Sequence, residues 1–213
     1  MARSTANLET IAQRLRQGFA EKDSAREKAL RLSREVIRHS SVTIRALHRH
    51  EIDQARELLA QARNACEELD RSLANHAEFL RSGFHHDAQK EYAEASITLA
   101  VITGQPVPEP EELRVAPAAY LNGMGEAVGE IRRYLLDGMR RNDLSSSEEI
   151  LSAMDDIYAI LVTMDFPDAM TGGLRRTTDL VRGILEKTRG DLTLSFRQKE
   201  LEGRLDRILR EKP

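Results

Sequence analysis

Glutamates at two places in the chain have the spacing of paired ligands or acid–base groups. Glu91 and Glu94, in the segment KEYAEASITLAVITG, are three residues apart, so on a helix their carboxylates lie about 60° apart on one face. Residues 93–102 are mostly apolar and cover the whole circumference, which predicts a helix buried nearly all round. Carboxylates at the edge of such a helix are costly unless they are paired or bind a metal. The alternative is an exposed first turn, where the helix dipole favours both glutamates.

A second pair, Glu126 and Glu130, is four residues apart, or about 40° on a helix. The apolar stripe of that helix lies on the opposite side and consists of Leu121, Met124, Val128 and Leu135. Gly123 and Gly129 share the glutamate face, although each glycine costs about 1 kcal/mol relative to Ala inside a helix. Close approach of a second helix, or room for a ligand, would explain them. The alternative is a solvated face on which Glu130 pairs with Arg133.

Four carboxylates from two helices form the hard-oxygen donor set that Mg²⁺ or Mn²⁺ prefers. Such an ion lowers the pKa of bound water and stabilises an in-line phosphoryl displacement. Di-iron carboxylate bundles use Glu-x-x-His pairs instead, and no Glu in this chain has a His three residues later. The residue types therefore favour Mg²⁺ or Mn²⁺ over iron, with Glu91, Glu94, Glu126 and Glu130 as candidate ligands.

A third feature is a basic face in residues 30–51, LRLSREVIRHSSVTIRALHRHE. Within about 100° of one helix face lie Arg34, Arg38, Ser41, Arg45, His48 and Arg49. The opposite face is lined by Leu32, Val36, Thr43 and Leu47. A linear row of arginines can follow the phosphates of a nucleic acid. An ordinary solvated face is the alternative.

Composition narrows the function classes further. The 213 residues carry 32 Lys+Arg against 35 Asp+Glu, a net charge of −3, which excludes a partner held by bulk positive charge alone. The single cysteine, Cys66, excludes an intrachain disulfide and a Cys-rich metal site, and its helical context predicts a buried structural thiol. The sequence contains no P-loop, GxGxxG, GxSxG or CxxC motif.

The chain also contains no segment typical of export or membrane insertion. The first twenty residues include Glu9 and no apolar block, so they do not resemble a signal peptide. The apolar-rich run from Ala93 to Ile102 is too short for a membrane span, which needs about 18 apolar residues. We expect a soluble, cytoplasmic protein without a membrane partner.

Few aromatics (4%), 12 glycines and 6 prolines argue against a β-sandwich or barrel and favour helices with an aliphatic core. Apolar periodicity and breakers predict helices over about 5–51, 51–80, 86–103, 116–141, 147–163 and 174–210. We expect a bend near residues 22–24 and interruptions at Gly190 and Thr193. The Pro-rich segment after Gly104 is predicted as a loop that no regular element crosses. The fold class is therefore all-α, a bundle of about six to seven helices forming a single domain over residues 1–213.

Four segments in this order resemble the translin/TRAX family, most closely its TRAX-like prokaryotic and archaeal members. They are AREKALRLSREVIRHSSVTIRALHR, KEYAEA, YLNGMGEAVGEIRR and LRRTTDLVRGILEKTRGDLT, and the resemblance covers roughly residues 20–195. It implies an all-α fold of about seven helices that assembles into hollow octamers. TRAX-type subunits are Mg²⁺-dependent endoribonucleases that act on single-stranded RNA inside that shell.

The family's catalytic motif Glu-Tyr-x-Glu matches Glu91, Tyr92, Ala93 and Glu94. Its second acidic pair matches Glu126 and Glu130, although the first member is Asp in the family and Glu here. The resemblance also implies that the arginine-rich face of residues 30–51 binds RNA.

Together, the residues and the resemblance predict a metal-dependent endoribonuclease with Mg²⁺ (or Mn²⁺) held by Glu91, Glu94 and Glu126, and Glu130 as a further ligand or the base for water. Phosphates would be positioned by Arg34, Arg38, Arg45, His48 and Arg49. The expected partners are single-stranded RNA, single-stranded DNA as a second ligand, and further copies of the chain in an octamer. Two alternatives remain, a translin-like oligomer that binds nucleic acid without cutting it and a helical interaction module that binds none.

Overall fold

The computed structural model describes residues 5–210, and this part of the chain is built from helices without any strand. Six helices of 17 to 41 residues and two single-turn helices follow one another in the order α1 (Leu8–His48), α2 (Ile52–Ser72), α3 (Gly83–Ile102), α4 (Pro110–Leu113), α5 (Pro117–Arg140), α6 (Ser147–Thr163), α7 (Asp168–Thr171) and α8 (Leu174–Arg210). The predicted all-α bundle is confirmed.

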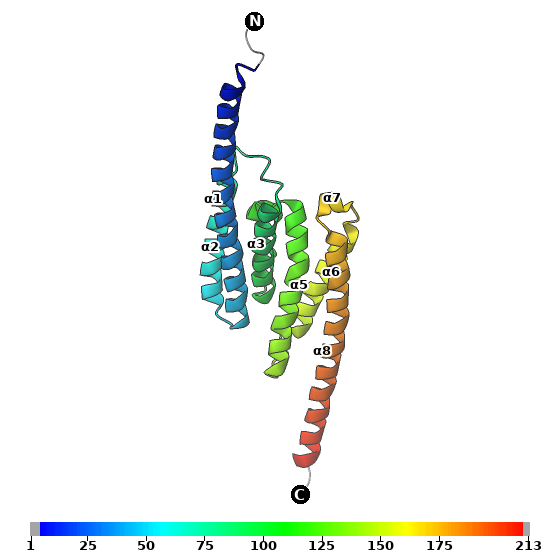
Figure 1. Cartoon of the computed structure of the whole chain (residues 1–213). Coiled ribbons are helices and arrows are strands. Elements are labelled where there is room, and N and C mark those ends of the chain that lie inside the picture. The colour runs from blue at the N-terminus through cyan, green and yellow to red at the C-terminus, as the bar shows by residue number, and fades with distance from the viewer. Residues whose placement is uncertain (1–4, 211–213) are drawn as a thin grey trace.

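Helices α3 and α5 occupy the centre of the bundle (Figure 1). Helices α1 and α2 pack on one side of this pair, and α6 and α8 pack on the other. Neighbours α3 and α5 run in the same direction, so the segment between them must return along the length of the bundle. The two helices that carry the paired glutamates are therefore the two with neighbours on both sides.

The predicted burial of the central helix is confirmed between residues 92 and 98 of α3, where every residue is buried. Small side chains such as Ala93 and Ala95 let α1, α2 and α5 approach this helix closely, and Ile97 fills the remaining space. Such a helix has little amphipathic character, because it has no solvent side in this stretch.

The core is aliphatic, as the composition predicts. Its largest fully buried side chains are Leu32, Leu47, Leu69, Leu73, Ile97, Ile131, Met154, Leu161, Leu174, Leu185, Leu192 and Val36. Cys66 is buried among them, and burial raises the pKa of its thiol to about 12. A thiol in that state is not a nucleophile at neutral pH, so the structural assignment of Cys66 is confirmed.

Helix boundaries differ from the prediction in the first half of the chain. Helix α2 ends at Ser72 instead of residue 80, because residues 73–82 form successive turns. The Ser72 and Ser82 hydroxyls donate to backbone carbonyls three residues earlier, which competes with continued helix. Helix α3 correspondingly begins at Gly83, three residues before the predicted start.

The Pro-rich segment does contain a short helix, contrary to prediction. Pro110 occupies the first turn of α4, where its missing N–H is not needed. The Glu112 carboxylate accepts a hydrogen bond from the backbone N–H of Glu109 at 2.9 Å, which completes a capping box. Residues 105–109, which include Pro106 and Pro108, have no regular secondary structure, as predicted.

The two longest helices are uninterrupted. Helix α1 continues through residues 22–24, and α8 continues through Gly190 and Thr193, so the predicted bend and interruptions are wrong. In α8 the Thr193 hydroxyl donates to the Arg189 carbonyl one turn earlier without ending the helix.

Both long helices extend past the bundle, α1 at one end and α8 at the other (Figure 1). These extensions expose large apolar side chains, namely Leu8, Leu15 and Phe19 on α1 and Leu201, Leu205, Ile208 and Leu209 on α8. They form apolar surface that the rest of the described chain leaves uncovered. No helix between residues 5 and 210 is long and apolar enough to cross a bilayer.

Gly123 explains how close the two central helices lie. A Cβ at this position would be 2.5 Å from the Lys90 carbonyl oxygen and 3.0 Å from the Glu94 backbone nitrogen, so only glycine fits without moving α5. This confirms close helix approach as the reason for Gly123. Gly129 has no such neighbour, since a Cβ there would meet only Ile184 Cδ1 at 4.0 Å.

We therefore expect Gly123→Ala to lower the free energy of unfolding by roughly 2 kcal/mol or more, because the methyl group meets backbone that cannot rotate away. Gly190→Ala, on an exposed position of α8 with open space around it, is the control and should raise the free energy of unfolding by up to about 1 kcal/mol. Urea denaturation of both variants measures the difference. Equal stability of the two variants would contradict the tight α3–α5 contact.

Candidate metal centre and nucleic-acid interface

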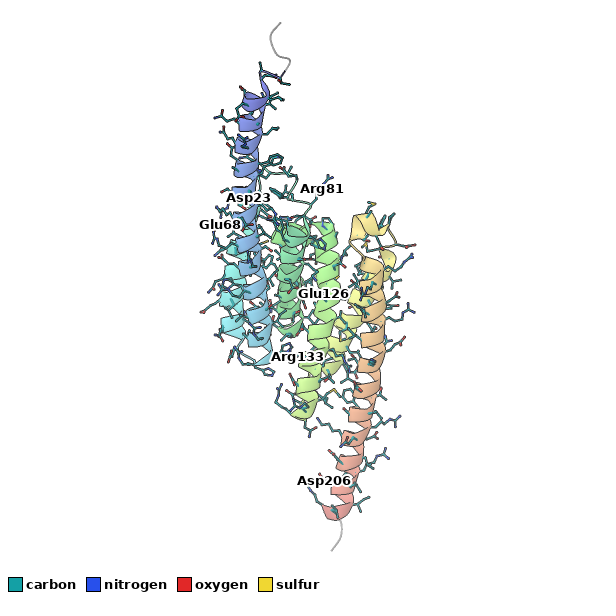
Figure 2. The ribbon with its side chains drawn as sticks, viewed as in Figure 1. Asp23, Glu68, Arg81, Glu126, Arg133 and Asp206 are labelled. Carbon is teal, nitrogen blue, oxygen red and sulfur yellow. The ribbon has the colours of Figure 1, made fainter. Side chains whose placement is uncertain are left out.

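Three of the four predicted glutamates come together between the central helices. One carboxylate oxygen each from Glu91, Glu94 and Glu126 lies within 4.8 Å of the other two. Glu91 lies in the third turn of α3 and Glu94 in the fourth, so the alternative of an exposed first turn is wrong. Glu126 follows Gly123 by one turn on α5 and lies about halfway along that helix (Figure 2). The three residues are called the carboxylate cluster below.

A cavity of about 460 Å³ opens beside the carboxylate cluster. Its other walls are Gly125 of α5 and Thr177, Leu180 and Ile184 of α8. Gly125 allows α8 to approach here, because any side chain at this position would collide with the Thr177 methyl group. The cluster therefore faces a space in which a ligand can reach all three carboxylates.

Burial and mutual repulsion change the acidity of the cluster. Burial, followed by the charges of Glu91, Glu126 and Glu130, raises the pKa of Glu94 from 4.5 to about 8. Burial also raises the pKa of Glu91, against the lowering effect of Lys90. The repulsion between these carboxylates is the physical reason why a cation would be held here.

Lys90 supplies the cation that the described residues place against the cluster. Its Nζ donates to Glu126 Oε1 at 2.8 Å and lies 3.8 Å from Glu91 Oε1. Burial alone would lower the pKa of Lys90, but the hydrogen bond to Glu126 and the nearby negative charges outweigh it and raise that pKa. Sequence reasoning missed Lys90, although its place directly before Glu91 was visible.

Glu130 lies outside the carboxylate cluster and has a different partner. Glu130 Oε2 lies 2.5 Å from His48 Nε2, and this hydrogen bond lowers the pKa of Glu130. Arg133, the partner of Glu130 in the alternative of a solvated face, lies 4.0 Å from Glu130 Oε2. The His48 side chain is 6% exposed and its Nδ1 has no hydrogen-bond partner among the described residues, so His48 belongs with Glu130 and not with the exposed basic face.

The other four predicted phosphate ligands do lie on the surface of α1. Exposed side chains occupy all four positions, Arg34, Arg38, Arg45 and Arg49. A shallow depression of about 660 Å³ on the same helix is lined by Lys28, Arg31, Arg34 and Arg38 together with Glu27 and Glu35. Lys28 and Arg31 extend the basic face beyond the predicted residues. These cations lie outside the lining of the carboxylate cavity.

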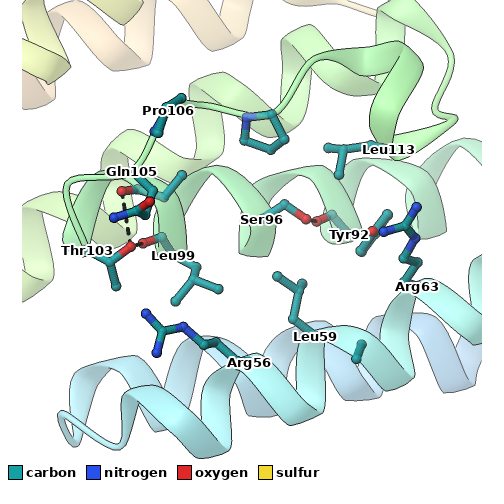
Figure 3. A pocket seen from close by; sticks show the side chains of 13 residues that line it. Arg56, Leu59, Arg63, Tyr92, Ser96, Leu99, Thr103, Gln105, Pro106 and Leu113 are labelled. Atoms are coloured by element: carbon teal, nitrogen blue, oxygen red, sulfur yellow. Dashed lines mark hydrogen bonds between the residues drawn. The ribbon is translucent and has the colours of Figure 1, made fainter.

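A second cavity, of about 370 Å³, lies between α2, α3 and the Pro-rich segment (Figure 3). Its lining is mainly apolar, including Leu59, Leu99 and Leu113, with Arg56 and Arg63 at its edge. No carboxylate, histidine or cysteine is among its lining residues, so it offers no set of metal ligands.

The carboxylate cluster fits a hard divalent cation. All three donors are carboxylate oxygens, which Mg²⁺ and Mn²⁺ prefer over nitrogen or sulfur. Glu94 is buried, yet no described donor makes a hydrogen bond to its carboxylate, so its lone pairs are free for a ligand. The residues present thus match the ion that the sequence predicts.

Comparison with known proteins finds one similar sequence and several similar structures, which cover most of this chain. An uncharacterized protein of Methanocaldococcus jannaschii is 32% identical over 192 residues, covering 89% of this chain and 85% of the relative. AfC3PO in complex with duplex RNA is 33% identical with a TM-score of 0.78, and AfC3PO alone is 31% identical with a TM-score of 0.79. Each alignment covers 88% of this chain and 97% of AfC3PO. Apo-NeC3PO, at 20% identity and a TM-score of 0.74 over 92% of this chain and 98% of its own, shares the fold. No protein-family model matches the chain.

The raised pKa of Glu94 makes the stability of the metal-free protein depend on pH. The folded protein keeps a proton on Glu94 up to about pH 8, whereas the unfolded chain releases it near 4.5, so unfolding becomes easier as pH rises between these values. The loss from this group is on the order of 4 kcal/mol, and Glu94→Gln should remove it. Urea denaturation in EDTA from pH 5 to 8 measures the slope.

The exposed Glu148 of α6 provides the control, because Glu148→Gln should leave the pH dependence of wild type unchanged. A Glu94→Gln protein with the same loss of stability from pH 5 to 8 as wild type would show that Glu94 titrates normally.

Proposed function

The chain belongs to the translin/C3PO family, and from this premise we propose that it is a metal-dependent endoribonuclease whose site is the carboxylate cluster. The observation that carries the proposal is the convergence of Glu91, Glu94 and Glu126 from two helices beside one cavity. The three carboxylates repel one another and Glu94 is buried, and a bound divalent ion would offset both costs in free energy.

The proposed ion is Mg²⁺ or Mn²⁺, which when bound lowers the pKa of water and neutralises charge that develops on a phosphodiester. Glu91, Glu94 and Glu126 are its proposed ligands. Buried Glu94 must lose its proton on loading, since carboxylate ligands bind metals in the ionised form.

Glu130 is the proposed base for the attacking water. His48 holds its carboxylate in the ionised form, because the hydrogen bond from the imidazole favours the charged state. Glu130 also follows Glu126 by one helical turn, so the two carboxylates lie on the same side of α5. An ionised carboxylate can accept a proton from water, and the lowered pKa of Glu130 makes it a weaker base than an unpaired glutamate.

RNA is the proposed substrate. AfC3PO, which shares 33% of its residues with this chain in the aligned region, forms a complex with duplex RNA. We propose single-stranded RNA as the form that is cut, from the family resemblance, with the exposed arginines of α1 holding its phosphates. The uncovered apolar extensions of α1 and α8 support further copies of this chain as the partners in the proposed octamer.

We expect the wild type to cut an end-labelled single-stranded RNA at internal positions in Mg²⁺ and to leave it intact in EDTA. Glu94→Gln should reduce the cleavage rate at least about a hundredfold while RNA still shifts on a native gel, because the amide cannot act as an anionic ligand. Glu148→Gln serves as the folded control. A duplex RNA of the same sequence, run in parallel, tests the strand preference.

Cleavage by Glu94→Gln at the wild-type rate would show that the site is elsewhere. RNA that shifts on the gel but stays intact in both Mg²⁺ and Mn²⁺ would identify a binding-only oligomer instead.

The basic face makes a separate prediction. Arg34→Gln combined with Arg38→Gln should weaken RNA binding and reduce the slope of log affinity against log salt by about 1.4 for two lost contacts on a single strand. Arg71→Gln, an exposed arginine on α2, is the matched control and should change neither quantity. Fluorescence anisotropy at several salt concentrations measures both quantities. An unchanged slope in the double variant would show that these arginines of α1 do not contact RNA.

A further inference from the structure

Lys90 is the cation that the described residues hold against the carboxylate cluster. Its ammonium lies 2.8 Å from Glu126 Oε1 and 3.8 Å from Glu91 Oε1, and the side chain is only 20% exposed. Arg133, a cation nearby on α5, is 61% exposed and reaches Glu130 at 4.0 Å. One partly buried positive charge is thus shared by two of the three carboxylates.

The close approach of α3 and α5 fixes this arrangement. The Lys90 carbonyl lies against Gly123, so the backbone from which the side chain starts is held at the contact between the two helices. Across that contact the ammonium reaches Glu126, one turn beyond Gly123. The ion pair therefore joins the same two helices that supply the carboxylates.

An ammonium and a divalent metal compete when they need the same lone pairs. Lys90 donates its hydrogen bond to Oε1 of Glu126, one of the three residues whose carboxylates converge within 4.8 Å. A metal that binds this carboxylate must displace the ammonium or accept its positive charge close by, and both options cost free energy.

We propose that Lys90 is a resident counter-ion that competes with the divalent metal for Glu126 and thereby sets the metal affinity of the cluster. The inference rests on the proposed function, because it takes the carboxylate cluster as the metal site. When no metal is bound, the Lys90 ammonium offsets the negative charge of the cluster and reduces the repulsion between its carboxylates. The same ion pair makes the cluster bind the metal more weakly.

The test is calorimetric titration of the full-length protein with Mn²⁺ at pH 7.5, without RNA, so that affinity is measured independently of activity. Lys90→Met keeps the aliphatic stem and removes the charge, and it should bind Mn²⁺ roughly tenfold more tightly than wild type, as expected for loss of a partly buried competing ion pair. Lys90→Arg keeps the charge and should stay within about threefold of wild type. Lys90→Gln is a second neutral variant, and thermal unfolding of each protein confirms that it is folded.

Arg133→Gln is the matched control, since it removes an equal charge from the neighbouring Glu130 without touching the cluster. It should change Mn²⁺ affinity by less than about twofold. If Arg133→Gln raised the Mn²⁺ affinity as much as Lys90→Met, the effect would come from the net charge of the protein and not from competition for Glu126. That result would overturn the proposal.

Neutral Lys90 variants that bind Mn²⁺ as weakly as wild type, or more weakly, would also overturn it. Failure of the proposed function gives a different pattern, in which Glu94→Gln binds Mn²⁺ as well as wild type because the metal lies elsewhere. If neither wild type nor the neutral Lys90 variants bind Mn²⁺, both inferences are wrong.

Discussion

The contact between α3 and α5 at Gly123 is the constraint on which the rest of the structure depends. It brings backbone of one helix against backbone of the other, so the side chains that flank the contact must meet. Glu91 and Glu94 on one helix and Glu126 on the other flank it, and they converge at a depth where water can solvate them only in part. Carboxylates forced together in this way repel one another unless a proton or a cation separates them.

Both a proton and a cation reduce the repulsion between these carboxylates. Glu94 takes a proton through its raised pKa, while Lys90 supplies an ammonium to Glu126 and Glu91. Glu130 is separated from this group by its own partner, His48, and stays ionised. Four glutamates on two helices therefore divide into a cluster of three and a single carboxylate that is paired with His48.

The features of the site that could be predicted from the sequence are those that depend on residues within one helix. The spacing of Glu91 and Glu94 and the buried character of α3 could be read within one helix, and the structure confirms that α3 is buried and that the two carboxylates lie close together. The link from α3 to Glu126 was a hypothesis from residue type that the family resemblance strengthened, with Gly123 as a local sign of a close contact. Lys90 and His48 were beyond such reasoning, because their roles depend on which side chain of another helix lies opposite. The end of α2 was missed since turns at residues 73–82 depend on serine hydroxyls that bond locally to the backbone.

The extensions of α1 and α8 make the stability of the protein depend on its concentration. A helix end of about 15 residues with no packing partner is only marginally stable in water, so these turns persist as continuations of helices nucleated in the bundle. Their leucines gain burial only if another surface covers them, and any such association adds to the free energy of unfolding by mass action. The melting temperature of the chain should then rise with its concentration, and the amide hydrogens of the helix tips should exchange far faster than those of α3.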